Sequence, residues 1–275
     1  MSAPDTPTAS GPLASILALP NDSGKKTLFM AFSVCLVCSV VVAAAAVGLR
    51  PQQIANQEAD RIRNIVEVAG IQQPGESIMK AYERIEVELI KLDDGSASDA
   101  LDPNTFNIQR ATKDPAISHA LKRRDDPAGL KRRTDYMPIY KVRDASGKLK
   151  TLILPIHGAG LWSTLYGFLA LDGDLRTAHG LKFYQHAETP GLGGEVDNPK
   201  WRALWQGKVV YDEQWAPSIA LVKGTVDTSL PGAEHKVDGL AGATLTSRGV
   251  TRLINYWLGE HGYGPLIERL RNERG

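Results

Sequence analysis

The sequence predicts an α+β fold, in which a twisted, antiparallel-dominated sheet has helices packed against it and is preceded by one transmembrane helix. Three observations carry this prediction. A run of 23 residues without charge, 27–49, lies near the N-terminus. Alternating runs joined by a tight turn, over 136–156, are typical of an antiparallel hairpin. A few helical patterns are mixed with these strands, which indicates the α+β class.

The balance of charge limits the kinds of partner. The 275 residues hold 32 Lys and Arg against 31 Asp and Glu, a formal net charge of +1. Nucleic acid is therefore not expected as a partner, because counterion-release binding needs a strong basic excess. The two cysteines, Cys35 and Cys38, both lie in the apolar run, which excludes a disulfide framework. We interpret them as small residues of a membrane helix rather than as a metal pair.

The apolar run is long enough to cross a membrane. At about 1.5 Å per residue, a helix over 27–49 spans roughly 35 Å. A cleavable signal has a shorter apolar core, whereas this run follows a short tail, residues 1–26, of which we expect the first 24 to be disordered. We therefore expect a retained transmembrane helix in contact with lipid. Lys25 and Lys26 precede the run and Arg50 follows it, so charge alone leaves the orientation open.

Residues 50–135 are expected to form a linker of mixed structure. Apolar positions at helical spacing predict an amphipathic helix over 54–69 that ends at Gly70. A short helix is expected near Glu76. Alternation over 85–89 then predicts a half-buried strand.

The second half of this linker, residues 93–135, is polar. It contains two basic clusters, 122–124 (KRR) and 131–133 (KRR), with acidic residues beside them. A polyanion site is one interpretation of these clusters. The neighbouring acids and the lack of aromatic residues favour a solvated excursion.

Residues 136–275 are expected to form the main domain. The hairpin has strands over 136–143 and 148–156 around a turn at 144–147. Further strands are expected over 165–171, 180–185, 208–211 and 218–223.

Two helices are predicted in this domain. Asn198 and Pro199 are typical of an N-cap followed by proline in the first turn, and we expect Trp201, Leu204 and Trp205 to face inward. The apolar spacing also predicts a helix over 247–258.

Two glycine-rich segments are candidates for ligand binding. The first, 186–195 (HAETPGLGGE), lets the backbone adopt positive φ and approach a flat or anionic ligand closely. A tight structural connection is the alternative. The second, 238–247 (DGLAGATLTS), lies before the last predicted helix, whose free N–H groups can hold a phosphate. Here the alternative is an N-cap at Thr246 or Ser247, which is compatible with phosphate binding.

Other candidates are weaker. The histidines His157, His179, His186 and His235 lack metal-site spacing, and we interpret them as surface or hydrogen-bonded residues. We expect neither a metal site nor a catalytic residue, because no hydrolase or zinc-protease motif occurs. Trp162 follows a turn of small residues, where it either covers a ring system or, as we expect, is buried in the core.

The second segment resembles a known motif. Residues 238–244 (DGLAGAT) are similar to the D-x-x-(S/T)-G-A-T motif, by which FMN-binding subunits of membrane redox pumps carry a covalent flavin. Together with 188–193 (ETPGLG), 197–201 (DNPKW) and the membrane helix, nearly the whole chain resembles the family of C subunits of the sodium-translocating NADH:quinone oxidoreductases (NQR).

The resemblance implies that a flavin transferase joins the phosphate of FMN to the Thr244 hydroxyl as a phosphoester. Ala241 stands where Ser or Thr is usual, but that hydroxyl is not the acceptor, so we expect modification. The loop 188–193 is then expected to border the isoalloxazine ring, in an FMN-binding domain over 136–275. The other residues expected to contact FMN are Asp238, Gly242, Ala243, Leu245, Thr246, Glu188, Thr189, Gly191, Leu192, Gly193 and Trp162.

The resemblance also implies a place in a complex of six subunits in the bacterial inner membrane, with this domain in the periplasm. In such complexes electrons pass from NADH through FAD, iron–sulfur centres and flavins to ubiquinone, coupled to sodium export, and the C subunits act as relays. One alternative is the flavin subunit of the ferredoxin-linked Rnf redox pump, which shares the threonine motif but is disfavoured by residues 188–201 and the long N-terminal region. Another is a non-redox, membrane-anchored binding domain.

Overall fold

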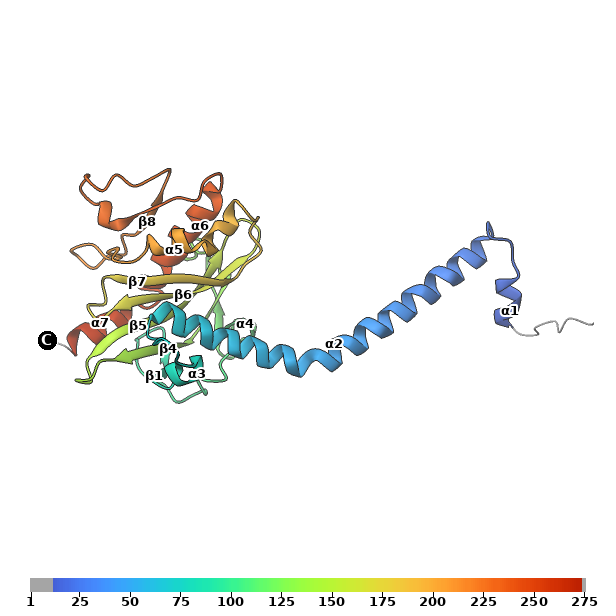
Figure 1. The fold of residues 1–275 in the computed structure, drawn as a ribbon, viewed down its shortest axis with the longest axis horizontal. Coiled ribbons are helices and arrows are strands. Elements are labelled where there is room, and N and C mark those ends of the chain that lie inside the picture. The colour runs from blue at the N-terminus through green and yellow to red at the C-terminus, as the bar shows by residue number, and fades with distance from the viewer. Residues whose placement is uncertain (1–11, 274–275) are drawn as a thin grey trace, which may run out of the picture. The chain divides into compact units, whose positions relative to one another are not determined.

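The computed structural model describes residues 12–273. The chain divides into two compact units, residues 1–59 and 60–275, which we describe separately. The first contains helix α1 (Pro12–Leu17) and most of helix α2 (Gly24–Ala69) (Figure 1). Because α1 is helical, the expectation of disorder is wrong for these six residues. The last residues of the predicted tail, Lys25 and Lys26, belong to α2. Residues 1–11 of the tail lie outside the described residues.

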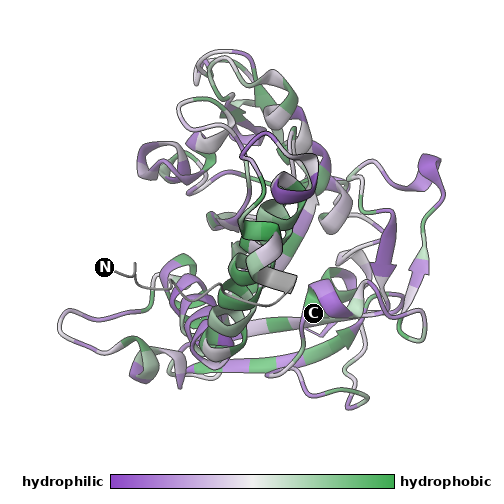
Figure 2. Ribbon diagram, turned by 90° about the vertical axis from the view of Figure 1, so that its right-hand side faces the viewer, coloured by the Kyte–Doolittle hydropathy of each residue, from purple (hydrophilic) through white to green (hydrophobic). Residues whose placement is uncertain are grey.

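Helix α2 contains the candidate membrane segment. Within residues 12–273 it is the one helix long and apolar enough to cross a membrane, judged by length and composition. Its apolar side chains in this segment are exposed, and Figure 2 shows the predominance of hydrophobic residues along it. The helix continues through Pro51 to Ala69, so the predicted membrane helix and the predicted amphipathic helix are one continuous helix.

The second unit is built on a five-stranded sheet in which every neighbouring pair of strands is antiparallel, which confirms the predicted α+β class (Figure 1). The predicted hairpin is present as the second and third strands of the sheet. The sheet order is β1 (Ile85–Lys91), β4 (Tyr136–Arg143), β5 (Leu149–Ala159), β6 (Thr164–Asp172) and β7 (Ala178–Gln185).

Both faces of this sheet are covered. On β5, Leu152, Leu154 and Ile156 enter a core with residues of the C-terminal helices α6 (Thr244–Leu258) and α7 (Gly264–Asn272). Ile153 points to the other face, where it joins a second core with the end of α2. This period-two alternation is typical of a strand buried on both sides.

Strand β1 pairs with β4 along its whole length, from Ile85 opposite Val142 to Lys91 opposite Tyr136. Residues before position 136 therefore belong to the same compact unit as those after it. The expected boundary between residues 135 and 136 does not separate two compact units.

The remaining elements are short. The predicted helix near Glu76 is α3, capped by the Ser77 hydroxyl, and Asn198 caps α5 as predicted. Leu204 is 38% exposed rather than inward-facing, and residues 208–211 form only isolated bridges. Helix α7 has no counterpart among the predicted helices. The short elements are α3 (Ile78–Tyr82), α4 (Ile108–Ala111), β2 (Ser118–Ala120), β3 (Arg132–Thr134), α5 (Pro199–Ala203), β8 (Ala220–Val222) and β9 (Lys236–Asp238).

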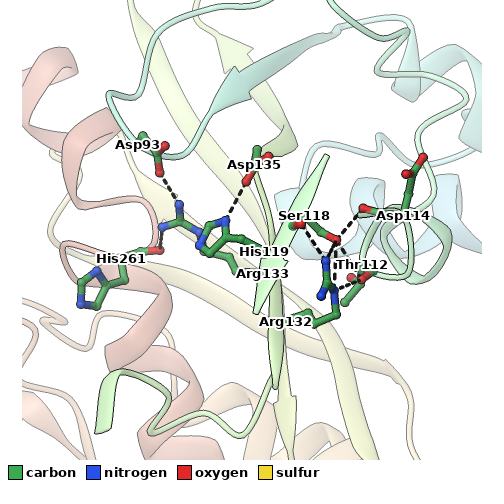
Figure 3. Close-up of polar contacts among 9 residues, drawn as sticks. All are labelled: Asp93, Thr112, Asp114, Ser118, His119, Arg132, Arg133, Asp135 and His261. Carbon is green, nitrogen blue, oxygen red and sulfur yellow. Dashed lines mark hydrogen bonds and ion pairs between the residues drawn. The ribbon is translucent and has the colours of Figure 1, made fainter. Parts of the chain in front are cut away.

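The polar excursion is anchored by the buried Arg133 and the half-buried Arg132, which corrects the prediction that its second basic cluster is solvated. Arg133 is 5% exposed, and its guanidinium donates to the His261 carbonyl at 2.6 Å and to Asp93 (Figure 3). Arg132 donates to the Ser118 carbonyl at 2.7 Å and to the Thr112 carbonyl at 3.2 Å. The Arg133 bond to His261 attaches residues 93–135 to the turn that connects α6 and α7.

Replacing Arg133 with Met is expected to lower the free energy of unfolding by about 1–3 kcal/mol, because the His261 carbonyl and Asp93 lose their donor. The matched control is Arg124→Met, since the Arg124 side chain is 78% exposed. The midpoint of thermal unfolding is measured for both variants in the detergent-solubilised chain. Each kcal/mol of lost stability should lower this midpoint by about 2–4 °C. Equal shifts for the two variants would contradict the anchoring role of Arg133.

Candidate functional site

The two glycine-rich segments meet at the N-terminus of α6. Thr244 is the first residue of this helix and is exposed. Ala243 occupies the N-cap position, with no hydrogen bond from its side chain. The helix therefore begins three residues earlier than predicted, and Thr246 and Ser247 lie in its first turn rather than at its cap. The first N–H groups of a helix have no intrahelical acceptor, so they are available to an anion beside Thr244.

Glu188, from the first segment, is buried against this helix start. It is 5% exposed. Its Oε2 accepts a hydrogen bond from the Thr246 hydroxyl at 2.5 Å. Its Oε1 accepts from the backbone N–H groups of Leu161 at 2.9 Å and Trp162 at 3.0 Å. One carboxylate thus contacts both α6 and the turn between β5 and β6.

Glycine is required where the segments approach each other. A Cβ at Gly193 would lie 2.6 Å from both Glu188 Oε2 and Thr246 Oγ1. A Cβ at Gly160 would overlap Glu188 Oε1. Only Gly191 and Gly242 at this site have positive φ, of 74° and 71°. The glycines of the first segment therefore serve close packing as much as unusual backbone conformation.

Exposed apolar side chains surround the helix start. Trp162 is 70% exposed, so the expectation that it is buried in the core is wrong. Leu192 and Leu245 are also exposed, at 44% and 53%. The Leu192 side chain reaches the second segment, since a Cβ at Gly242 would lie 2.8 Å from its Cδ2. These groups provide an apolar surface for a flat ligand beside Thr244.

Asp238 and Thr189 shape the loops through their backbone and side-chain bonds. The Asp238 carboxylate accepts from the Val226 N–H at 2.8 Å, and its carbonyl accepts from the Trp201 indole at 2.9 Å. The Thr189 carbonyl accepts from the N–H groups of Leu192 and Gly194. Both residues thus have structural partners within the protein.

Two residues at the site, Ser247 and Arg248, were not among the residues expected to contact FMN. Ser247 bridges the second segment, since its Oγ accepts from the Leu240 N–H and donates to the Ala243 carbonyl, both at 3.0 Å. Arg248 is exposed and makes no ion pair with another residue in the range 12–273. It follows Thr244 by four residues, the helical spacing that places two side chains side by side, and this spacing was the available signal.

Four histidines were considered in the sequence, and the structure gives three of them a hydrogen-bond partner within the protein. His179 and His186 bond to Asp172 and Asp197, each at 2.8 Å, and His235 bonds to the Val209 carbonyl, as expected. His157 is buried instead, and burial lowers its pKa to about 4, so its ring is neutral near pH 7. Among the described residues, no group of three or more His, Cys, Asp or Glu side chains could hold a metal ion.

Comparisons with known proteins agree with this geometry. The FMN-binding domain family matches residues 160–259, which include both glycine-rich segments and all of α6. The C subunit of the Na(+)-translocating NADH-quinone reductase of Pseudomonas aeruginosa is 52% identical, over 91% of this chain and 97% of that protein. The corresponding protein of Yersinia pestis is 47% identical, over 91% of this chain and 94% of that protein.

A solved structure is also similar. The crystal structure of Shewanella oneidensis NqrC superposes with a TM-score of 0.73 and 33% sequence identity, over 79% of this chain and 99% of that one. Identity at this level over most of both chains shows common family membership. The chain therefore belongs to the family of C subunits of the Na(+)-translocating NADH-quinone reductases, which are oxidoreductase complexes, and it contains an FMN-binding domain.

Proposed function

We propose that this chain carries FMN as a phosphoester on Thr244 and relays electrons between redox centres of the reductase. The observation that carries the proposal is the exposed Thr244 hydroxyl at a helix start whose N-cap residue has no capping side chain. The phosphoester would place a negative charge where the α6 N–H groups and the helix dipole stabilise it. Ala241 is exposed in the same loop, and the hydroxyl missing there is not needed for this bond.

The surrounding residues fit the rest of the cofactor. We expect Trp162, Leu192 and Leu245 to contact the isoalloxazine ring, because they are exposed apolar side chains on the three segments that meet at the start of α6. The bound flavin would supply the capacity to accept and pass on single electrons. The protein's part is to hold the ring on an apolar surface and the phosphate at the helix start.

The wider role follows from the family. We propose that the chain receives electrons that originate from NADH and passes them toward ubiquinone, in a complex of six subunits that exports sodium. A flavin transferase would attach the FMN. The residues over 27–49 would cross the bacterial inner membrane, with the flavin domain in the periplasm. A covalent bond keeps the cofactor on the chain, where it cannot dissociate into the periplasm.

Thr244→Ala is expected to abolish flavin attachment, because the acceptor oxygen is lost. Co-expression with the flavin transferase, followed by fluorescence of the denatured chain in a gel at its mass of 29.8 kDa, measures attachment. Mass spectrometry should find the FMN adduct on the peptide that contains Thr244. Thr244→Ser retains a hydroxyl and is the control, expected to keep some label. A fluorescent Thr244→Ala chain would contradict the proposed attachment site.

Arg248→Ala is expected to slow flavin attachment about 2- to 5-fold, because an exposed charge one turn from the phosphate stabilises it only modestly. Arg252 is the matched control, since it is exposed on the same helix but one turn farther from Thr244. The rate of flavin incorporation with limiting transferase is measured for Arg248→Ala and for Arg252→Ala. Equal rates for the two variants would show that Arg248 does not contact the phosphate.

The flavin domain is expected to be accessible from the periplasm. Trypsin added to spheroplasts should cleave it, since Arg248 and other basic residues of the domain are exposed. The same protease should leave the domain intact in inside-out membrane vesicles. The reverse pattern, with cleavage in the vesicles alone, would place the domain in the cytoplasm.

A further inference from the structure

We infer that Glu188 is a positioning residue, which holds the Trp162 turn and the start of α6 in the arrangement that a bound flavin needs. This inference rests on the proposed attachment of FMN to Thr244. The family resemblance suggests that Glu188 contacts the ring. The structure instead occupies both of its carboxylate oxygens with hydrogen bonds to the protein.

The first set of bonds fixes the turn that presents Trp162. Two successive N–H groups, of Leu161 and Trp162, converge on Glu188 Oε1. Two amides that share one acceptor define the direction of the backbone at that point. The Trp162 side chain has little other support, because it is 70% exposed. The position of its backbone relative to the start of α6 is therefore set mainly by this bonded turn.

The second bond fixes the start of α6. The Thr246 hydroxyl lies two residues beyond Thr244 and donates to Glu188 Oε2 at 2.5 Å. Thr246 is fully buried, so this bond is shielded from water and is stronger than an exposed one. The same helix also approaches the end of β5 closely, since a Cβ at Gly249 would lie 2.6 Å from the Ala159 carbonyl.

The backbone of Glu188 is fixed as well. Its N–H donates to His186 Nδ1 at 3.2 Å, while His186 Nε2 bonds to Asp197 at 2.8 Å. Gly160 and Gly193 leave room for the Glu188 carboxylate. A Cβ atom at either position would collide with it. The backbone of Glu188 is therefore fixed by contacts within its own loop, and its side chain bonds to the two other segments.

The test measures how closely the attached flavin approaches Trp162. An aromatic side chain in contact with isoalloxazine quenches its fluorescence, and denaturation removes the contact. The readout is the fluorescence of the native, detergent-solubilised chain divided by that of the same chain after denaturation, with flavin loading taken from the denatured value. This ratio does not depend on the activity of the complex.

Glu188→Ala is expected to raise this ratio several-fold, as is Trp162→Ala. Glu188→Gln should keep the ratio near that of the unaltered chain, because its Oε1 can accept from both amides and its Nε2 can donate to Thr246 Oγ1. Glu195→Ala is the matched control in the same loop. Glu195 bonds to Asn198 at 2.7 Å and to neither of the other two segments, so its loss should leave the ratio unchanged.

A second pair of variants keeps the inference testable if Glu188→Ala does not fold. Thr246→Val removes the hydroxyl at nearly constant volume and should raise the ratio, while Thr246→Ser should not. If Glu188→Ala does fold, the double variant Glu188→Ala/Thr246→Val should raise the fluorescence ratio by less than the two single variants together. Non-additivity of this kind is expected for residues in contact.

Unchanged ratios in both Glu188→Ala and Thr246→Val, at normal loading, would overturn the inference. If Glu188→Ala does not fold, an unchanged ratio in Thr246→Val alone would do so. A chain of unaltered sequence that carries no flavin after denaturation would instead contradict the proposed function. The two failures are therefore distinguishable.

Discussion

The hydrogen bonds of the Glu188 carboxylate join three segments that are far apart in the sequence. They connect the loop after β7, the turn between β5 and β6, and the first turn of α6. Removing a carboxylate from water is costly unless its oxygens are bonded, and here three donors converge on it. The arrangement makes the candidate site a property of the folded domain, because all three donors come from the protein itself.

This arrangement depends on a sheet that is buried on both faces. Strand β5 contributes Leu154 to the core beneath α6 and Ile153 to the core beneath the end of α2. Glu67, near that end of α2, bonds to Lys182 on β7 and to Arg202 on α5. The first glycine-rich segment, residues 186–195, lies between these two basic residues in the sequence. These ion pairs attach the C-terminal end of α2 to β7 and α5, the elements on either side of residues 186–195.

Much of the fold could be predicted from the sequence, because the patterns involved are local. The hairpin over 136–156, the Asn198 cap and the end of the last predicted helix at Leu258 rest on alternation, capping chemistry and helical spacing. The extent of the second compact unit, residues 60–275, could not be predicted, since the pairing of β1 with β4 is a contact across the 93–135 excursion. For the candidate site, motif resemblance selected Thr244 as the proposed attachment residue. The partners of Glu188 and the exposure of Trp162 could not be predicted, because they depend on tertiary packing.

A high-resolution structure of the full chain, purified from membranes with its flavin attached, would show the roles of Thr244 and Glu188 directly. We predict continuous density from Thr244 Oγ1 to the FMN phosphorus, with the ring against Trp162. We also predict that the Glu188 carboxylate still accepts from Leu161, Trp162 and Thr246. Flavin attached at another residue, or Glu188 turned away from these donors to contact the ring, would contradict these predictions.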